Sequence, residues 1–278
     1  MNARHLILLP VLLAPMTALA ADRVEERDAW TETWTVTADE PLLDISNIWG
    51  NVIVQPGAEG EITLSVKELR SAPTPELLTR SHEALPVNVA GDEAGVSLVV
   101  GHRDERWQRM DPCRHCRVAL DIEVRVPRGA RIDVATVNEG RVSVSGITGP
   151  VSARNVNGPV TVEGAHACEE LASVNGAVRI GFDARPGGDC SIETINGDIR
   201  LSVPADSGLD IAMDLFNGRV VSALPVDPLA LPARIEHSTS GGRHRYTIDQ
   251  PAGIRIAGGG PVFSVSSMNG DVRIQKNP

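Results

Sequence analysis

The feature that most constrains this chain is a short motif that recurs about every twenty residues. In a typical copy, an apolar residue is followed by Asn and Gly, and then by two alternating apolar positions; in the copy at Asn138, Glu139 separates the Asn from its Gly. The asparagines of the six copies are the following: Asn138, Asn157, Asn175, Asn196, Asn217 and Asn269. The first five are separated by 19, 18, 21 and 21 residues. Self-similarity at a fixed period of this size indicates a solenoid or a related array.

The apolar positions within one copy distinguish a winding coil from a β-hairpin. Around Asn196, the apolar residues are Ile192 and Ile195 before it, and Ile199 and Leu201 after it. A hairpin would keep strict alternation, whereas this pattern slips between Ile192 and Ile195. A slip is expected where a chain turns a corner and keeps its apolar groups inward. Coils stacked at ~4.8 Å would then form one inward row: Val160, Val178, Ile199 and Val220.

The repeat therefore predicts an all-β fold, namely a parallel β-solenoid (β-helix) of ~20-residue coils with one short N-terminal helix. An antiparallel β-sandwich remains the alternative. In the solenoid, the six asparagines form a structural ladder at one corner, where their amides can hydrogen-bond between coils. The glycine after each asparagine is expected to supply a positive φ at that corner.

The two ends of the chain depart from the repeat. Residues 1–20 combine a positive start, a short apolar run and Ala-Leu-Ala before Ala21, which predicts a cleaved signal peptide. Residues 21–42 are expected to form a capping strand. Residues 43–278 would form the solenoid domain, with insertions at about 70–117 and 222–252. Thr74 followed by Pro75 marks the start of the helix.

The four cysteines are expected to form disulfides, because disulfides persist in exported proteins. Cys168 and Cys190 occupy nearly equivalent positions one coil apart, which is within disulfide range. Two buried free thiols are the alternative for this pair. Cys113 and Cys116 form a Cys-x-x-Cys motif that we interpret as a local disulfide. A zinc site, with Cys113, Cys116 and His115 as ligands and His102 as a distant fourth, and a redox pair are the other possibilities.

The sequence offers little chemistry for an enzyme. No Ser-His-Asp spacing stands out, and the glycines at Gly258–Gly260 precede a strand rather than a helix, so they do not form a phosphate loop. Asn-Gly-Asp occurs in two copies only, which is too sparse for calcium-binding repeats. We therefore predict a protein without catalytic residues, metal or cofactor.

Several segments resemble, in order, a bacterial family labelled "putative adhesin", a β-strand-repeat domain of unknown function. They are the repeated motif, "ISNIWGNVIVQPG", "EVRVPRGARIDV" and the closing "GGGPVFSVSSMNGDVRI". The resemblance covers roughly residues 43–274 and implies a β-solenoid exposed at or beyond the cell envelope. It implies no established activity and no functional residues.

The predicted function is that of a non-enzymatic, exported envelope protein, adhesin-like or scaffolding, without a transmembrane span. The periplasm is the expected location, with the cell surface or secretion as alternatives. The expected partner is an envelope component or another protein. Nucleic acid is not expected, because the formal net charge is −10.

Two outward arginines are the candidate binding residues. Arg179 and Arg200 lie one coil apart, and like charges in such positions are unfavourable unless an anion or neighbouring acids compensate them. The alternative function is a glycan-binding or glycan-active protein on the same scaffold. Its mark would be a groove with two or more carboxylates beside a Trp.

Overall fold

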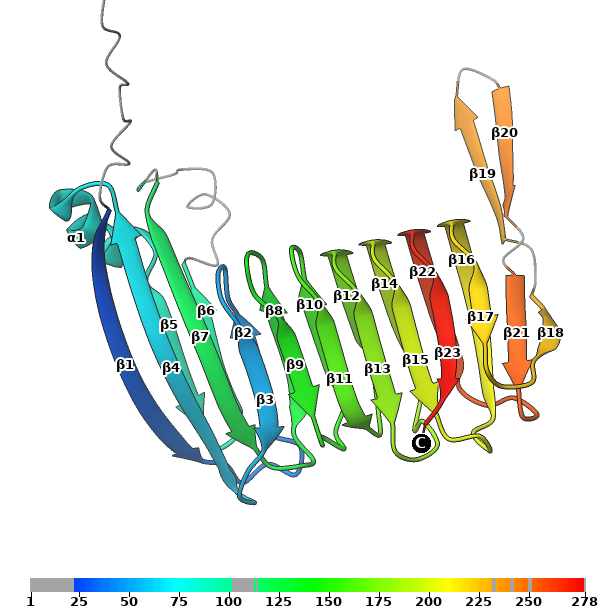
Figure 1. Ribbon diagram of the computed structural model, residues 1–278, viewed down its shortest axis with the longest axis horizontal. Coiled ribbons are helices and arrows are strands. Elements are labelled where there is room, and N and C mark those ends of the chain that lie inside the picture. The colour runs from blue at the N-terminus through cyan, green and yellow to red at the C-terminus, as the bar shows by residue number, and fades with distance from the viewer. Residues whose placement is uncertain are drawn as a thin grey trace, which may run out of the picture.

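The computed structural model describes residues 23–277, except 102–112, 114, 232–233, 241–242 and 250–251. The fold of these residues is all-β with one helix, α1 (Pro75–Ala84), which confirms this part of the prediction. The strands form two large mixed sheets, here called sheet A with ten strands and sheet B with eleven. The strands of both sheets follow one another along the long axis of the molecule (Figure 1). Neither closes on itself, because each ends in two edge strands.

Consecutive strands of the chain join the two sheets in alternation. We call each such pair of strands a coil, with its first strand in sheet B and its second in sheet A. The coils are β2 (Leu42–Ser46) with β3 (Val52–Pro56), β6 (Gly95–Val100) with β7 (Arg117–Val126), β8 (Arg131–Thr136) with β9 (Val142–Ser145), β10 (Val151–Asn155) with β11 (Val160–Ala165), β12 (Glu170–Asn175) with β13 (Val178–Phe182), β14 (Cys190–Asn196) with β15 (Ile199–Val203), β16 (Leu209–Asn217) with β17 (Val220–Ser222), and β22 (Val262–Asn269) with β23 (Val272–Lys276). Neighbouring strands from these coils are parallel.

The order of the coils in space differs from their order in the chain. The last coil, β22–β23, lies between β14–β15 and β16–β17. Ile199 and Val220 therefore both pair with Val272, and the predicted direct contact between Ile199 and Val220 is wrong. The reason is that equivalent repeats can stack in any order that satisfies their pairing. At the other end, β2–β3 likewise lies between β6–β7 and β8–β9.

Antiparallel strands flank this stack of coils at both ends. At the N-terminal end, β1 (Val24–Thr35) and β4 (Glu61–Ala72) extend sheet A, and β5 (Val87–Asp92) extends sheet B. At the other end, β21 (Ala252–Ile256) and β18 (Asp227–Ala230) extend sheet B. The strands β19 (Arg234–Ser240) and β20 (Arg243–Asp249) pair only with each other and project from the stack (Figure 1).

The helix lies at the N-terminal end of the stack (Figure 1). The hydroxyl of Thr74 accepts a hydrogen bond from the backbone N–H of Leu77, and Pro75 follows the cap, as the sequence indicates. The helix is too short and too polar to cross a membrane, and it is the only helix in the described part of the chain.

The core lies between the two sheets and consists mostly of Val, Ile and Leu. Two of the three Phe side chains, Phe182 and Phe263, are fully buried there, with ring centroids 5.6 Å apart. Trp30 and Trp34 of β1 pack against the N-terminal end of the core. Burial of apolar surface contributes most of the stabilisation of such a fold.

Candidate functional site

The six motif asparagines lie in one row at the corner where sheet B turns into sheet A. The Nδ2 of every one except Asn138 donates to the Oδ1 of its neighbour over 2.9–3.0 Å. The order in space is Asn138, Asn157, Asn175, Asn196, Asn269 and Asn217. All five hydrogen bonds run in the same direction, so the row ends in an amide N–H at Asn138 and a carbonyl oxygen at Asn217. Trp49 is paired with Asn138 and takes the next place in the row.

A second, buried polar row lies inside the same corner, two positions before five of the six asparagines; Leu215 stands at this place before Asn217. The Thr136 hydroxyl donates to the carbonyl oxygen of Gly50, and the Thr194 hydroxyl to that of Gly176, both over 3.1 Å. Asn155 and Ser173 make the equivalent contacts. Sequence reasoning missed this row, although a polar residue at the same place in five of the six repeats was its signal.

Two corner glycines, Gly176 and Gly197, are required by close packing rather than by a positive φ, whereas Gly270 after Asn269 has a φ of 158°. A Cβ on Gly176 would lie 2.1 Å from the carbonyl oxygen of Gly158, and a Cβ on Gly197 would lie 2.1 Å from that of Gly176. Neither glycine has a positive φ, so the expected backbone explanation is wrong for them. Bare glycines allow neighbouring coils to approach closely at the corner.

The apolar residue immediately before each asparagine points outward, not inward as predicted. Ile195, Met268 and Phe216 occupy this position in three neighbouring coils, and they are 42%, 52% and 79% exposed. The strand in fact keeps its alternation up to the corner, because the inward position is the polar one of the buried row. The outer edge of sheet B therefore carries an apolar row beside the asparagines.

The candidate binding arginines are neighbours on the outer face of sheet A. Arg179 pairs with Arg200 across β13 and β15, and Arg200 pairs with Arg273 across β15 and β23. Arg273 is bound by Asp198 and Asp271. Within the described residues, no carboxylate lies within ion-pair distance of Arg179 or Arg200. The structure thus brings the two residues together and adds a third arginine to their row.

Asp198 lies beside this arginine row. It accepts hydrogen bonds from the backbone N–H of Asp271 at 3.1 Å and from the guanidinium of Arg273. These bonds, helped by the charges of Arg273 and Arg200, hold the pKa of Asp198 below its ordinary value of 3.8. The carboxylate therefore stays charged at neutral pH and partly balances the arginines.

Cys168 and Cys190 are joined in a disulfide, with their Cα atoms 5.2 Å apart. Cys190 begins β14, and Cys168 precedes β12, the neighbouring strand of sheet B. Both cysteines are buried in the core. The bond therefore links two successive coils at the start of their sheet B strands, and the asparagine corner lies at the other end of these strands.

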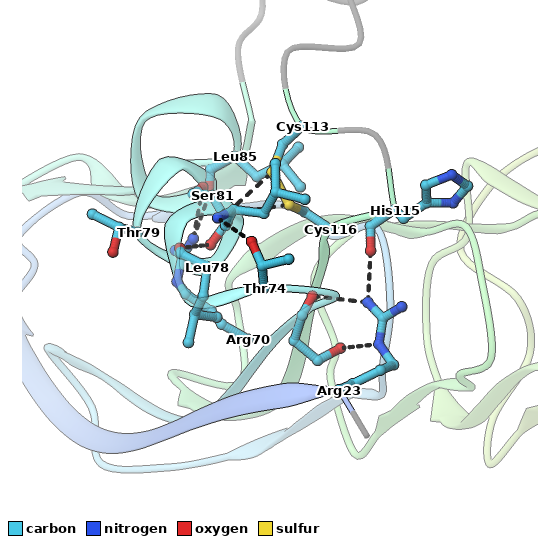
Figure 2. Close-up of a disulfide and its surroundings, with 12 residues drawn as sticks. Arg23, Arg70, Thr74, Leu78, Thr79, Ser81, Leu85, Cys113, His115 and Cys116 are labelled. Carbon is cyan, nitrogen blue, oxygen red and sulfur yellow. Dashed lines mark hydrogen bonds between the residues drawn. A yellow bond between two sulfur atoms is a disulfide. The ribbon is translucent and has the colours of Figure 1, made fainter. Parts of the chain in front are cut away.

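Cys113 and Cys116 form the second disulfide, which packs against α1 (Figure 2). Between them, the carbonyl oxygen of His115 accepts a hydrogen bond from Arg23 over 2.6 Å. His102, named for the zinc alternative, lies outside the described residues. In the part of the chain that is described, no group of three or more His, Cys, Asp or Glu side chains could hold a metal ion.

The N-terminal end of the stack contains an acidic cleft of about 650 Å³ between β1, β4, β5 and α1. Glu26, Asp28, Trp30 and Glu32 alternate along β1 and line this cleft from one face of the strand. Glu68 lines it from β4. These are carboxylates beside a tryptophan, the arrangement named above as the mark of a glycan site. Sequence analysis did not single out these carboxylates.

Two of the cleft's acids have a basic side chain beside them. Glu68 is paired with Arg70, whose Nη1 also donates to the carbonyl oxygen of Ser81 at the end of α1. The imidazole of His82 lies 3.1 Å from the carboxylate of Glu26. Asp28 and Glu32 have no ion-pair partner among the residues that the structure describes.

Comparisons with known proteins give only distant likenesses. No family model and no curated protein matches the chain. The chain is similar to a crystal structure described as a "putative cell adhesion protein" from Clostridium sporogenes, with 10% identity, a TM-score of 0.43, and coverage of 90% of this chain and 100% of the other. A "putative adhesin" from Bacteroides fragilis has 14% identity, a TM-score of 0.39 and coverage of 90% and 97%. One from Parabacteroides distasonis has 11% identity, a TM-score of 0.28 and the same coverage. Likenesses at this level establish neither an activity nor a partner for this chain.

Proposed function

We propose that this chain is a non-enzymatic, exported envelope protein, adhesin-like or scaffolding, built on a parallel β-solenoid. Residues 1–20 would be its signal peptide, residues 21–42 its capping strand and residues 43–278 its solenoid domain. Two disulfides support an oxidising location outside the cytoplasm, such as the periplasm. A macromolecular partner would bind along the rows that in-register stacking creates on the outer faces.

The row of Arg179, Arg200 and Arg273 carries this proposal. Three guanidinium groups lie on adjacent strands of a protein whose formal net charge is −10. Like charges side by side are unfavourable on their own, and only Arg273 has carboxylates within ion-pair distance in the described structure. An anionic envelope polymer would supply the missing charges for Arg179 and Arg200.

Co-sedimentation of the mature protein with isolated peptidoglycan, outer membranes or whole cells tests the proposal. We expect saturable binding to one of these fractions, weakened by raised salt because exposed charges are screened. The double variant Arg179→Ala, Arg200→Ala should lose most of this binding. Undiminished binding of the double variant would remove the arginine row from the proposal.

A matched control carries the same change of charge on the opposite sheet. Arg131 and Arg154 lie on the outer face of sheet B and are paired with Glu169 and Asp133 respectively. Arg131→Ala, Arg154→Ala should leave the binding unchanged. If both double variants lose binding equally, net charge rather than the row explains the effect.

The acidic cleft favours a second candidate function, glycan binding or glycan cleavage. Trp30 offers an apolar face to a sugar ring, and Asp28 and Glu32 on either side offer hydrogen-bond acceptors to its hydroxyls. Binding of soluble peptidoglycan fragments, measured by Trp fluorescence and calorimetry, tests this candidate. Trp30→Ala should abolish the binding, whereas the arginine double variant should not affect it. Release of reducing ends would indicate cleavage, which Asp28→Asn and Glu32→Gln should then reduce.

A further inference from the structure

The coil β16–β17 lies at the end of the stack opposite to α1, and its outer side is only partly covered. Strand β21 pairs with Leu209–Met213 of β16 and ends there. Strand β17 is the edge of sheet A and pairs only with β23. Residues 214–222, which run through the asparagine corner, pair with β22 and β23 on their inner side. In the described structure, no strand pairs with them on their outer side. We call residues 214–222 the open edge.

The backbone of the open edge presents unpaired hydrogen-bonding groups. The carbonyl oxygens of Asn217 and Arg219 and the N–H of Ala223 bond to β22–β23. Because alternate residues of a strand direct their backbone groups to opposite sides, the groups of Gly218 and Val220 face away from the stack. A row of such groups at strand spacing is a template for another strand.

The side chains of the open edge are unusual for a solvent-facing strand. Phe216 is 79% exposed and Val221 is 50% exposed. Most of the large, exposed apolar residues in the described structure lie near this end of the stack: Ile195, Phe216, Val221, Val226, Val262 and Met268. Exposed apolar residues gathered in this way mark interaction sites.

The asparagine row also ends here. Each Oδ1 from Asn138 to Asn269 accepts an Nδ2 from the next coil, whereas the Oδ1 of Asn217 receives none from any described residue. Arg219 is 80% exposed, and its closest carboxylate is that of Asp271 at 3.4 Å. A strand added beside the open edge would meet an amide acceptor, an apolar row and a guanidinium.

We propose that the open edge binds an extended polypeptide segment of a partner protein as a further strand of the stack. Only a peptide backbone supplies donors and acceptors at strand spacing, which favours a polypeptide over a glycan or a lipid. Apolar side chains of the segment would cover Phe216 and Val221, and an acidic side chain would lie beside Arg219. The open edge adjoins the arginine row, because Val221 pairs with Arg273 across β17 and β23. The contacts proposed here do not involve Arg179, Arg200 or the acidic cleft, so this test does not depend on the proposed function.

A synthetic peptide with the sequence of Ser266–Ile274 is a suitable probe, because this segment already pairs with residues 214–222 on the inner side of the same coil. Bound in the same register, it would bring an Asp beside Arg219, as Asp271 does now. The intact mature protein and the fluorescently labelled peptide are mixed, and fluorescence anisotropy is measured. We expect saturable binding. Absence of saturable binding overturns the proposal.

Two modified peptides test whether the backbone pairs. N-methyl groups on alternate residues block one edge of a strand and leave the other edge free. Methylation on the edge that faces the protein should abolish binding, whereas methylation on the outer edge should leave it intact. Equal binding of both peptides excludes strand addition and overturns the proposal.

Surface variants of the protein test the location. Phe216→Ser should weaken binding by roughly tenfold or more, as expected for a central apolar contact. Ile195→Ser, in the same apolar row but two coils inside the stack, is the matched control and should bind as the unchanged protein does. Equal losses in both variants would move the site away from the open edge and overturn the proposal.

A variant of Arg219 shows whether this residue recognises the partner or blocks the open edge, because natural proteins also use charged residues to block sheet edges. Arg219→Ala should weaken binding of the peptide if the guanidinium meets its acid. Stronger binding of the peptide by this variant would make Arg219 a blocking residue and overturn that part of the proposal. If this protein instead dimerises through Phe216 and does not bind the peptide, the open edge binds a second copy of this chain, and the proposal is overturned.

Discussion

Asn269 donates its Nδ2 to the Oδ1 of Asn196 over 3.0 Å, although the two residues are 73 positions apart in the chain. Asn217, only 21 positions after Asn196, is one coil further away and bonds to Asn269 instead. The C-terminal coil is therefore an interior layer of the stack, with packed neighbours on both sides.

A core residue of this coil should accordingly be important for the whole fold. Phe263 is fully buried and contacts the ring of Phe182. We expect Phe263→Ala to lower the free energy of unfolding by about 3–5 kcal/mol because it leaves a cavity. Phe216→Ala is the control, and this exposed substitution should change stability by less than about 0.5 kcal/mol. Urea unfolding followed by circular dichroism measures both, and equal effects would contradict the interior position.

The corner glycines should not tolerate a methyl group. In Gly176→Ala, the new Cβ would lie 2.1 Å from the carbonyl oxygen of Gly158, so the coils must move apart. We expect a loss of about 1–3 kcal/mol, the usual cost of overpacking. Nothing lies within 4 Å of a Cβ on Gly188, so Gly188→Ala should be nearly neutral. Thermal unfolding of the two variants compares them directly.

The disulfide between coils should contribute more stability than the local one. Cys168 and Cys190 are 22 residues apart, whereas Cys113 and Cys116 are separated by 3. A closed loop of the longer size restricts the unfolded chain by about 3 kcal/mol. Replacing Cys168 and Cys190 with Ser should lower the urea midpoint more than replacing Cys113 and Cys116. The reverse order would indicate that the packing of the local disulfide against α1 dominates.

Asp198 should make stability depend on acidic pH. Its pKa is lowered in the folded state by the N–H of Asp271 and by Arg273, so its contribution is fully present above the ordinary value of 3.8. The contribution should disappear as pH falls through the lowered, folded-state value. Asp198→Asn keeps an oxygen that can accept the backbone bond but removes the charge. The difference in melting temperature between the two proteins should be largest at neutral pH and vanish at the acidic end. A difference that is independent of pH would contradict this assignment.

The all-β class and the short helix follow directly from the sequence, because the repeat and the Thr74-Pro75 cap are local signals. The direction of Ile195 does not follow from hydropathy. The fold buries the polar Thr194 at the corner, where its hydroxyl satisfies the Gly176 carbonyl oxygen, and turns the apolar Ile195 outward. Hydrogen bonding of the neighbouring coil therefore outweighs hydrophobicity at these two positions.

The order of the coils and the acidic cleft depend on contacts that no local pattern encodes. Ile199 would fit against Val220 as well as against Val272, because both are valines in equivalent positions of the repeat. The cleft combines β1 with strands and a helix that follow it at varied distances in the chain. Glu26 and Glu68 belong to different strands, so their approach appears only once β1 and β4 have paired.

Because the coil β22–β23 lies inside the stack, the layers of the stack cannot be assembled in the order in which the chain is synthesised. A polypeptide leaves the ribosome with its N-terminus first, and its early parts begin to fold before the rest has been made. Residues 209–222 cannot reach their final neighbours at that time, because β22 and β23 are synthesised after them. A nascent or prematurely terminated chain would thus leave this segment without its permanent partner, which makes such chains susceptible to quality-control proteases.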